Sequence, residues 1–136
     1  MENLKQKIQE AVNLYKSGSL IKCEEFTKNL IKMNPEVVFL HNLLGMVLSA
    51  QGRTEEAVKS YNKGIEIDPN FAIIYNNLAL IYYNTRPLDW IDRRIFIEKA
   101  EALFKKSLKI NPQLPEPNTN LGNLYSLIGK NNKSIN

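Results

Sequence analysis

Residues 38–71 read VFLHNLLGMVLSAQGRTEEAVKSYNKGIEIDPNF. Apolar residues recur in both halves of this stretch at the spacing of a helix. Gly52 is placed to end the first helix as a glycine in the left-handed region, and Thr54 is predicted to cap the start of the second. Pro69 ends the second helix, because proline cannot continue a helix and disfavours helical backbone one residue earlier. The stretch therefore predicts two helices joined by a tight turn, the first over about 37–51.

The same layout recurs along the chain. Pro35 and Pro69 lie 34 residues apart, whereas Pro112 follows Pro69 by 43 residues, nine more than this period. We place the extra residues near 86–94. Proline suits the first turn of a helix, so the helix that follows is predicted to start early, near Pro87–Asp89, and to project ~13 Å beyond its neighbours. The repeats predicted from this spacing cover about 4–37, 38–71, 72–114 and, in part, 115–136.

The apolar and small residues of 38–71 stand at fixed positions: His41, Leu44, Gly45, Leu48, Ala57, Tyr61 and Pro69. This spacing resembles the tetratricopeptide repeat pattern W-x2-L-G-x2-Y…A-x3-F…P, which has a period of about 34 residues. His41 stands in the place of the Trp, and Leu48 in the place of the Tyr. The resemblance implies an all-α fold: a right-handed α-α superhelix of antiparallel helix pairs, with about three and a half repeats in a single domain over residues 1–136.

Composition and charge argue against several classes of protein. The net charge is +4, but acidic and basic residues are interspersed, and nucleic-acid binding would need a basic stripe. Cys23 is the only cysteine, so no internal disulfide framework is expected. The first residues carry no apolar signal segment, and no stretch approaches the ~18 apolar residues of a membrane span. We therefore expect a cytoplasmic protein that binds neither nucleic acid nor membrane.

No catalytic constellation is visible. The chain has one His and one Cys, and it lacks metal-ligand spacings and glycine-rich phosphate loops. Cys23 is predicted to be a small buried residue, since no clear base is available to activate it. His41 is predicted to be a packed ring in the Trp position of the repeat. We therefore expect no enzyme activity, no metal and no cofactor.

The resemblance implies which side chains meet a partner, because the first helix of each repeat lines the concave side of the superhelix. Asn77 and Asn120 share one repeat position and resemble the asparagine ladder of O-linked N-acetylglucosamine transferases. An asparagine side chain both donates and accepts, so it can pair with a peptide backbone. The alternative is coincidence in an asparagine-rich chain. The binding residues implied by the resemblance are Asn42, Met46, Asn76, Asn77, Leu80, Asn84, Asn120 and Asn123.

The inserted segment is a second candidate surface. It contains residue types that are enriched at binding hot spots, namely Arg86, Trp90, Arg93 and Arg94. The alternative for Trp90 is packing of the longer helix back onto the third repeat.

The sequence ends at Asn136, where a fourth repeat would be starting its second helix after Gly129. We expect Leu121, Leu124, Tyr125 and Ile128 to lose most of their covering helix. The chain is then either a fragment of a longer protein or associates through this end.

The function predicted is a protein–protein interaction module that binds a peptide or partner protein in its concave groove. One alternative is a targeting or substrate-docking domain of a larger enzyme such as a glycosyltransferase. Another is a scaffold that self-assembles into a homo-oligomer through its open C-terminal repeat.

Overall fold

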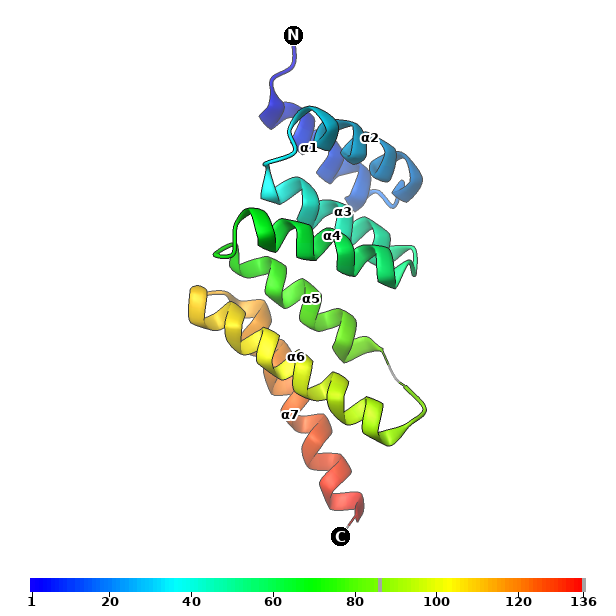
Figure 1. Ribbon diagram of the computed structural model, residues 1–136, viewed down its shortest axis with the longest axis vertical. Helices are drawn as coiled ribbons and strands as arrows, with labels where there is room; N and C mark the ends of the chain where they lie inside the picture. Colours follow the sequence, from blue (N-terminus) through cyan, green and yellow to red (C-terminus); the bar gives the residue numbers. More distant parts are fainter. Residues whose placement is uncertain (86, 136) are drawn as a thin grey trace. The chain divides into compact units, whose positions relative to one another are not determined.

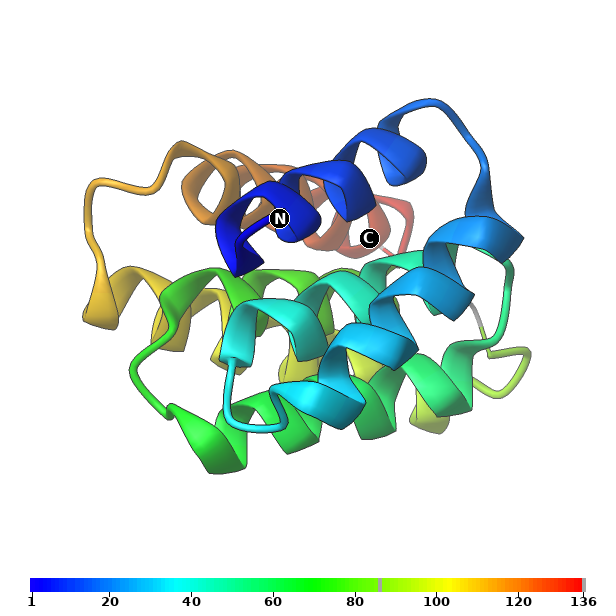
Figure 2. The same ribbon diagram turned by 90° about the horizontal axis from the view of Figure 1, so that it is seen from above.

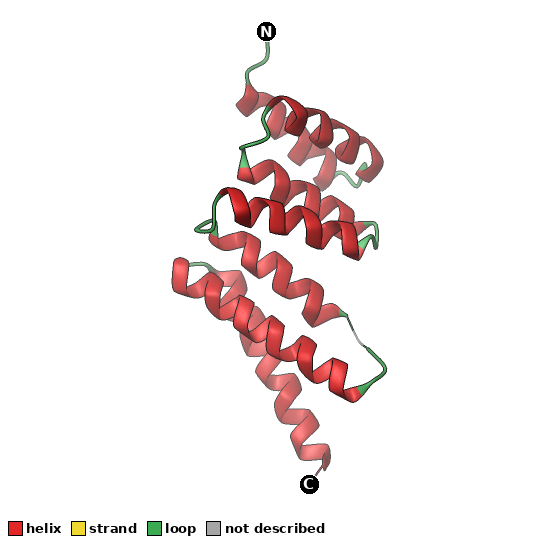
Figure 3. Ribbon diagram, viewed as in Figure 1, coloured by secondary structure: helices red, strands yellow, loops and turns green. Residues whose placement is uncertain are grey.

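The computed structural model describes the backbone of residues 1–85 and 87–135, and side chains as far as residue 129. Within these ranges every regular element is a helix and no strand occurs (Figures 1 and 3). The all-α prediction is therefore confirmed. The helices are α1 (Leu4–Lys16), α2 (Leu20–Met33), α3 (Val38–Ala50), α4 (Thr54–Ile67), α5 (Ala72–Asn84), α6 (Trp90–Ile110) and α7 (Pro115–Ile135).

Glycine residues allow the chain to turn after α1 and after α3. Gly18 and Gly52 adopt φ of 80° and 77°, a region that side chains with a Cβ rarely enter, and each directly follows the C-cap residue of its helix. The role predicted for Gly52 is confirmed. The role predicted for Thr54 was wrong by one residue: Arg53 holds the N-cap position and makes no side-chain cap bond. Its guanidinium is instead bound to two glutamates, and Thr54 is the first residue of α4.

Helix α6 contains the extra residues. It has 21 residues against 14 in α4, and it begins at Trp90 after α5 ends at Asn84, whereas α4 begins at Thr54 after α3 ends at Ala50. Asp89 is the N-cap, and its Oδ1 accepts from the backbone N–H of Ile91 at 2.7 Å. The early start predicted near Pro87–Asp89 is thus found at Trp90. The seven extra helical residues correspond to about 10 Å of helix rather than the ~13 Å predicted.

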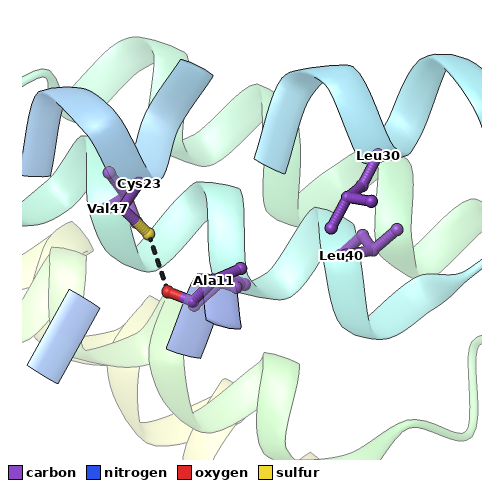
Figure 4. Close-up of a cluster of buried hydrophobic side chains, with 6 residues drawn as sticks. Ala11, Cys23, Leu30, Leu40 and Val47 are labelled. Carbon is purple, nitrogen blue, oxygen red and sulfur yellow. Dashed lines mark hydrogen bonds between the residues drawn. The ribbon is translucent and has the colours of Figure 1, made fainter. Parts of the chain in front are cut away.

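The helices form two compact units, Met1–Pro69 with α1–α4 and Asn70–Asn136 with α5–α7, and each is described by itself. Figure 2 shows the helices from above, and Figure 4 shows side chains packed between the helices of the first unit. Cys23 and Val47 lie beside Ala11, and Leu30 faces Leu40. All five are nearly or fully buried. The single domain over 1–136 stays a prediction.

In the second unit α5, α6 and α7 pack against one another around Ala79, Ala100, Phe104 and Leu124. Leu124 is fully buried, and Leu121 and Ile128 pack against the same cluster. The expectation that these residues would be left largely uncovered was wrong for Leu124, because α5 and α6 already enclose it. Helix α7 also continues past Gly129, where a turn had been expected.

Candidate functional site

Helices α5 and α7, the first helices of successive predicted pairs, lie in contact in the second unit and place a chain of amides between them. Nδ2 of Asn120 donates to Oδ1 of Asn76 at 3.0 Å, and Nδ2 of Asn76 donates to Oδ1 of Asn77 at 3.4 Å. Asn76 is only 3% exposed, so its amide depends on these neighbours. We call the surface around this chain the amide face: Asn76, Asn77, Leu80, Asn84, Asn120 and Asn123.

The amide face offers hydrogen-bonding groups to a partner. Oδ1 of Asn120 has no partner among the described residues, and the internal bond of its Nδ2 fixes the orientation of the whole amide. Asn84 and Asn123 are exposed, and their side-chain amides likewise make no hydrogen bond within the described part of the chain. Leu80 is half-buried and packs against the core cluster of the unit. The face therefore combines fixed polar groups with an apolar floor.

The ladder interpretation of Asn77 and Asn120 did not anticipate the residue between them. The structure joins both to Asn76, which links the two helices from a buried position. Their spacing in the sequence could not reveal this, because it depends on the contact between α5 and α7. One feature of the sequence could have indicated this link: Asn76 directly precedes Asn77 in a largely apolar helix, where a polar residue needs a hydrogen-bond partner.

The two remaining predicted binding residues lie on α3 in the first unit. Nδ2 of Asn42 donates to Sδ of Met46 at 3.6 Å, one turn along the helix. Asn42 is only 4% exposed. Hydrogen bonds therefore join three of the eight predicted residues, Asn76, Asn77 and Asn120, in the second unit and two more, Asn42 and Met46, on α3.

The start of α6 exposes a group of large apolar side chains. Trp90 is 70% exposed, so it does not pack back onto its own unit as the alternative for it had proposed. Leu88, Ile91 and Ile95 are also exposed, and sequence reasoning missed them because they continue a helical pattern that normally marks a core. We call these four residues the α6 patch.

The arginines beside the α6 patch have local partners. Nη2 of Arg93 donates to the carbonyl oxygen of Pro87 at 3.2 Å, and Arg94 pairs with Glu98 at 3.1 Å. These contacts brace the exposed start of the helix. Arg86, the remaining residue predicted for this surface, lies outside the described residues.

Cys23 and His41 have the packing roles predicted for them. The Cys23 thiol is fully buried and donates to the carbonyl oxygen of Ala11 at 3.2 Å, and burial raises its pKa. Such a thiol is a poor nucleophile. His41 is 6% exposed, and its Nε2 lies 2.9 Å from the carbonyl oxygen of Pro35. In the part of the chain that the structure describes, no three His, Cys, Asp or Glu residues gather to hold a metal.

Two segments of the chain match known family models, residues 45–85 the TPR repeat model and residues 103–136 the tetratricopeptide repeat model. The chain belongs to the tetratricopeptide repeat family. The first match spans the turn between the helices of one predicted pair and the whole first helix of the next. None of the described helices of this tetratricopeptide repeat chain is long and apolar enough to span a bilayer.

Known proteins agree with this assignment. The chain is 32% identical over 83 residues to the ycf37 protein of Pyropia yezoensis, which is 61% of this chain and 42% of that protein. It thus spans less than half the length of this relative. The first TPR of Spaghetti (RPAP3), solved with the HSP90 peptide SRMEEVD, superposes with a TM-score of 0.73 at 11% identity over 89% of each chain. The secretion chaperone SycD of Yersinia enterocolitica, solved with a peptide of the translocator YopD, gives 0.73 at 17% identity over 98% of this chain and 95% of its own.

Proposed function

We propose that this tetratricopeptide repeat chain is a non-enzymatic protein-interaction module that binds an extended peptide along the amide face. The observation that carries the proposal is the chain of amides from Asn120 through Asn76 to Asn77. Related folds have been solved with peptides bound, which supports a peptide as the ligand.

The chemistry of the face suits a peptide backbone. A backbone presents one donor and one acceptor per residue, and side chains alternate between its two faces. Oδ1 of Asn120 is held in place to accept a backbone N–H, and the exposed amides of Asn84 and Asn123 can donate and accept. The half-buried Leu80 can contact an apolar side chain of the peptide. Such a site favours extended backbone and selects weakly by sequence.

The test uses changes that leave the internal amide chain intact. We expect Asn84→Ala with Asn123→Ala to weaken partner binding by ~1–3 kcal/mol, because the partner's groups lose their hydrogen bonds. A pull-down from lysate with residues 1–136 as bait identifies the partner, and titration of that partner measures the loss. Asn120→Ala is a poorer probe, since it also removes the bond to the buried Asn76 and should destabilise the fold.

The matched control is Asn29→Ala with Asn118→Ala, which removes two exposed amides from outside the amide face. This control should bind as the unchanged chain does. Equal binding by the Asn84 and Asn123 variant would refute the amide face as the site.

The α6 patch supports a second binding surface for a folded partner protein. An exposed tryptophan beside arginines matches the composition of interface hot spots. We expect Trp90→Ala to weaken binding of such a partner by at least tenfold, because a central indole contributes about 2 kcal/mol or more at a hot spot. The fold should be unaffected, since this side chain is largely in solvent. A partner retained by Trp90→Ala but lost by the amide-face variant would assign binding to the amides alone.

The alternatives of a docking domain in a larger enzyme and of a self-assembling scaffold stay predictions. Light scattering over a range of concentrations separates the second, because a mass that stays at the monomer value excludes self-assembly.

A further inference from the structure

A second surface lies on the first unit. An open groove with a volume of about 580 Å³ runs between α2 and α4, which are the second helices of their pairs, with α3 beneath. Its floor is apolar and includes Ile31, Leu44 and Leu48, of which Leu48 is 3% exposed. Ser60 closes the floor and is tied down, because its hydroxyl donates to the carbonyl oxygen of His41 at 2.7 Å.

Lysines line both walls of this groove. Lys28 and Lys32 stand one turn apart on α2, and Lys59 and Lys63 stand one turn apart on α4. Glu56 is the single acidic residue among the lining residues. The groove is therefore strongly cationic in a chain whose charges are otherwise interspersed.

These lysines are not equally engaged. Lys28 pairs with Glu24 at 2.6 Å, and Lys63 reaches Glu66 only at 3.7 Å, where both side chains are exposed. Glu56 is bound to Arg53. Lys32 and Lys59 have no ion pair within the described residues and lie in walls that face each other across the apolar floor.

We propose that this groove binds an acidic, partly apolar peptide segment of a partner protein. Charge complementarity selects the acidic residues, because two lysines are without a counter-ion and a third is only weakly paired. The apolar floor selects a peptide over a simple anion, since an ion gains nothing from Ile31 and Leu44. This site is distinct from the amide face and does not depend on the function proposed for that face.

The spacing of the walls fits an extended peptide. Residues four apart on a helix are separated by about 6 Å along its axis. Alternate side chains on an extended peptide are separated by about 6.6 Å. Acidic residues at alternate positions can therefore point outward and meet the exposed ends of Lys59 and Lys63 at the rim of the groove, while the residues between them point the opposite way, toward the floor.

Isothermal titration calorimetry tests the proposal with the full chain and a short capped peptide in which Glu alternates with Leu. We expect saturable binding that weakens as salt is added. Lys32→Glu with Lys59→Glu should weaken it at least tenfold, because two attractive contacts become repulsive. Both side chains are exposed, so the far-ultraviolet circular dichroism of this variant should not change.

Three comparisons complete the test. The matched control, Lys5→Glu with Lys22→Glu, makes the same change in net charge at exposed sites outside the groove and should bind as the unchanged chain does. The Asn84→Ala, Asn123→Ala variant should also bind fully, which separates this site from the amide face. A peptide with Ser in place of Leu should bind at least threefold more weakly.

The proposal is overturned if the unchanged chain shows no saturable binding of the Glu-Leu peptide. It is equally overturned if the control variant, Lys5→Glu with Lys22→Glu, weakens binding as much as Lys32→Glu with Lys59→Glu does. Binding of the Glu-Ser peptide or of inorganic triphosphate as tightly as the Glu-Leu peptide would assign the groove to anions in general and would also overturn it.

Discussion

Gly45→Ala should destabilise the first unit by about 2–3 kcal/mol, although alanine is the better helix former by about 1 kcal/mol. A Cβ at this position would lie 2.5 Å from Cδ1 and 2.8 Å from Cζ of Tyr61, and closer still to Cε1. The Tyr61 ring is 2% exposed and cannot swing into solvent, and burial raises the pKa of its hydroxyl. Helices α3 and α4 would have to separate. Urea unfolding followed by circular dichroism measures the loss.

Gly122→Ala is the matched control, since a Cβ there meets nothing within 4 Å and α7 should gain about 0.5–1 kcal/mol. A second variant identifies the cause. Tyr61→Leu in the Gly45→Ala background should recover part of the loss, because the clash is with the ring. If Gly45→Ala is as stable as the unchanged chain, the close approach of α3 to α4 is not as described.

Glu24→Gln should destabilise the first unit by about 2 kcal/mol at neutral pH. The Glu24 carboxylate accepts from Lys28 and Arg53, each at 2.6 Å, and from Gln51 at 3.0 Å. It thereby joins α2 to the turn before α4. A neutral amide keeps the shape but loses two charge-assisted bonds. The loss is smaller than for a fully buried pair, because the side chains of Arg53 and Lys28 are 35% and 47% exposed.

The same contacts predict a dependence on pH. The bond from Lys28, with those from Gln51 and Arg53, lowers the pKa of Glu24 from 4.5 to about 2. A carboxyl whose pKa is lower in the folded state stabilises that state fully above the unfolded pKa and loses the effect as pH falls through the folded pKa. The contribution of Glu24, at most about 3 kcal/mol, should therefore disappear between about pH 5 and pH 2.

Urea unfolding of the unchanged chain and of Glu24→Gln across this range measures the effect. The difference in free energy of unfolding should shrink as the pH falls, and other carboxyls cancel because both proteins carry them. Glu25→Gln, at the exposed neighbouring position, should show no such difference. If the difference in free energy of unfolding between the unchanged chain and Glu24→Gln stays constant down to about pH 2, the role given to the Glu24 carboxylate is contradicted.

The fold could be predicted from particular residues because its determinants are local. Gly52 and Pro69 mark turns through their own backbone restrictions, and Gly45 with Ala57 marks the close approach of two helices. Contacts between distant residues could not be predicted in this way. Arg53 stands at the N-cap position while its guanidinium binds Glu24, 29 positions earlier, and Glu56, three positions later. Asn76 depends on a partner 44 residues away.

The candidate site likewise combines residues that could be predicted locally with contacts that could not. Asn77, Asn84, Asn120 and Asn123 could be named from their repeat positions, yet the internal bond that orients Asn120 appears only when α7 is placed against α5. The lysine-lined groove was missed for a similar reason. Its residues come from three helices, and no single stretch of sequence contains a dense basic run.

The exposed position of Trp90 has a practical consequence. It is the only tryptophan of the chain, and 70% of it is open to solvent in the folded state. In the folded protein its fluorescence is therefore that of a hydrated indole, and the ring remains hydrated when the protein unfolds. A ligand that covers the start of α6 would shift the emission to shorter wavelength. The intrinsic fluorescence of this protein is thus a poor probe of stability and a site-specific reporter of docking at one helix end.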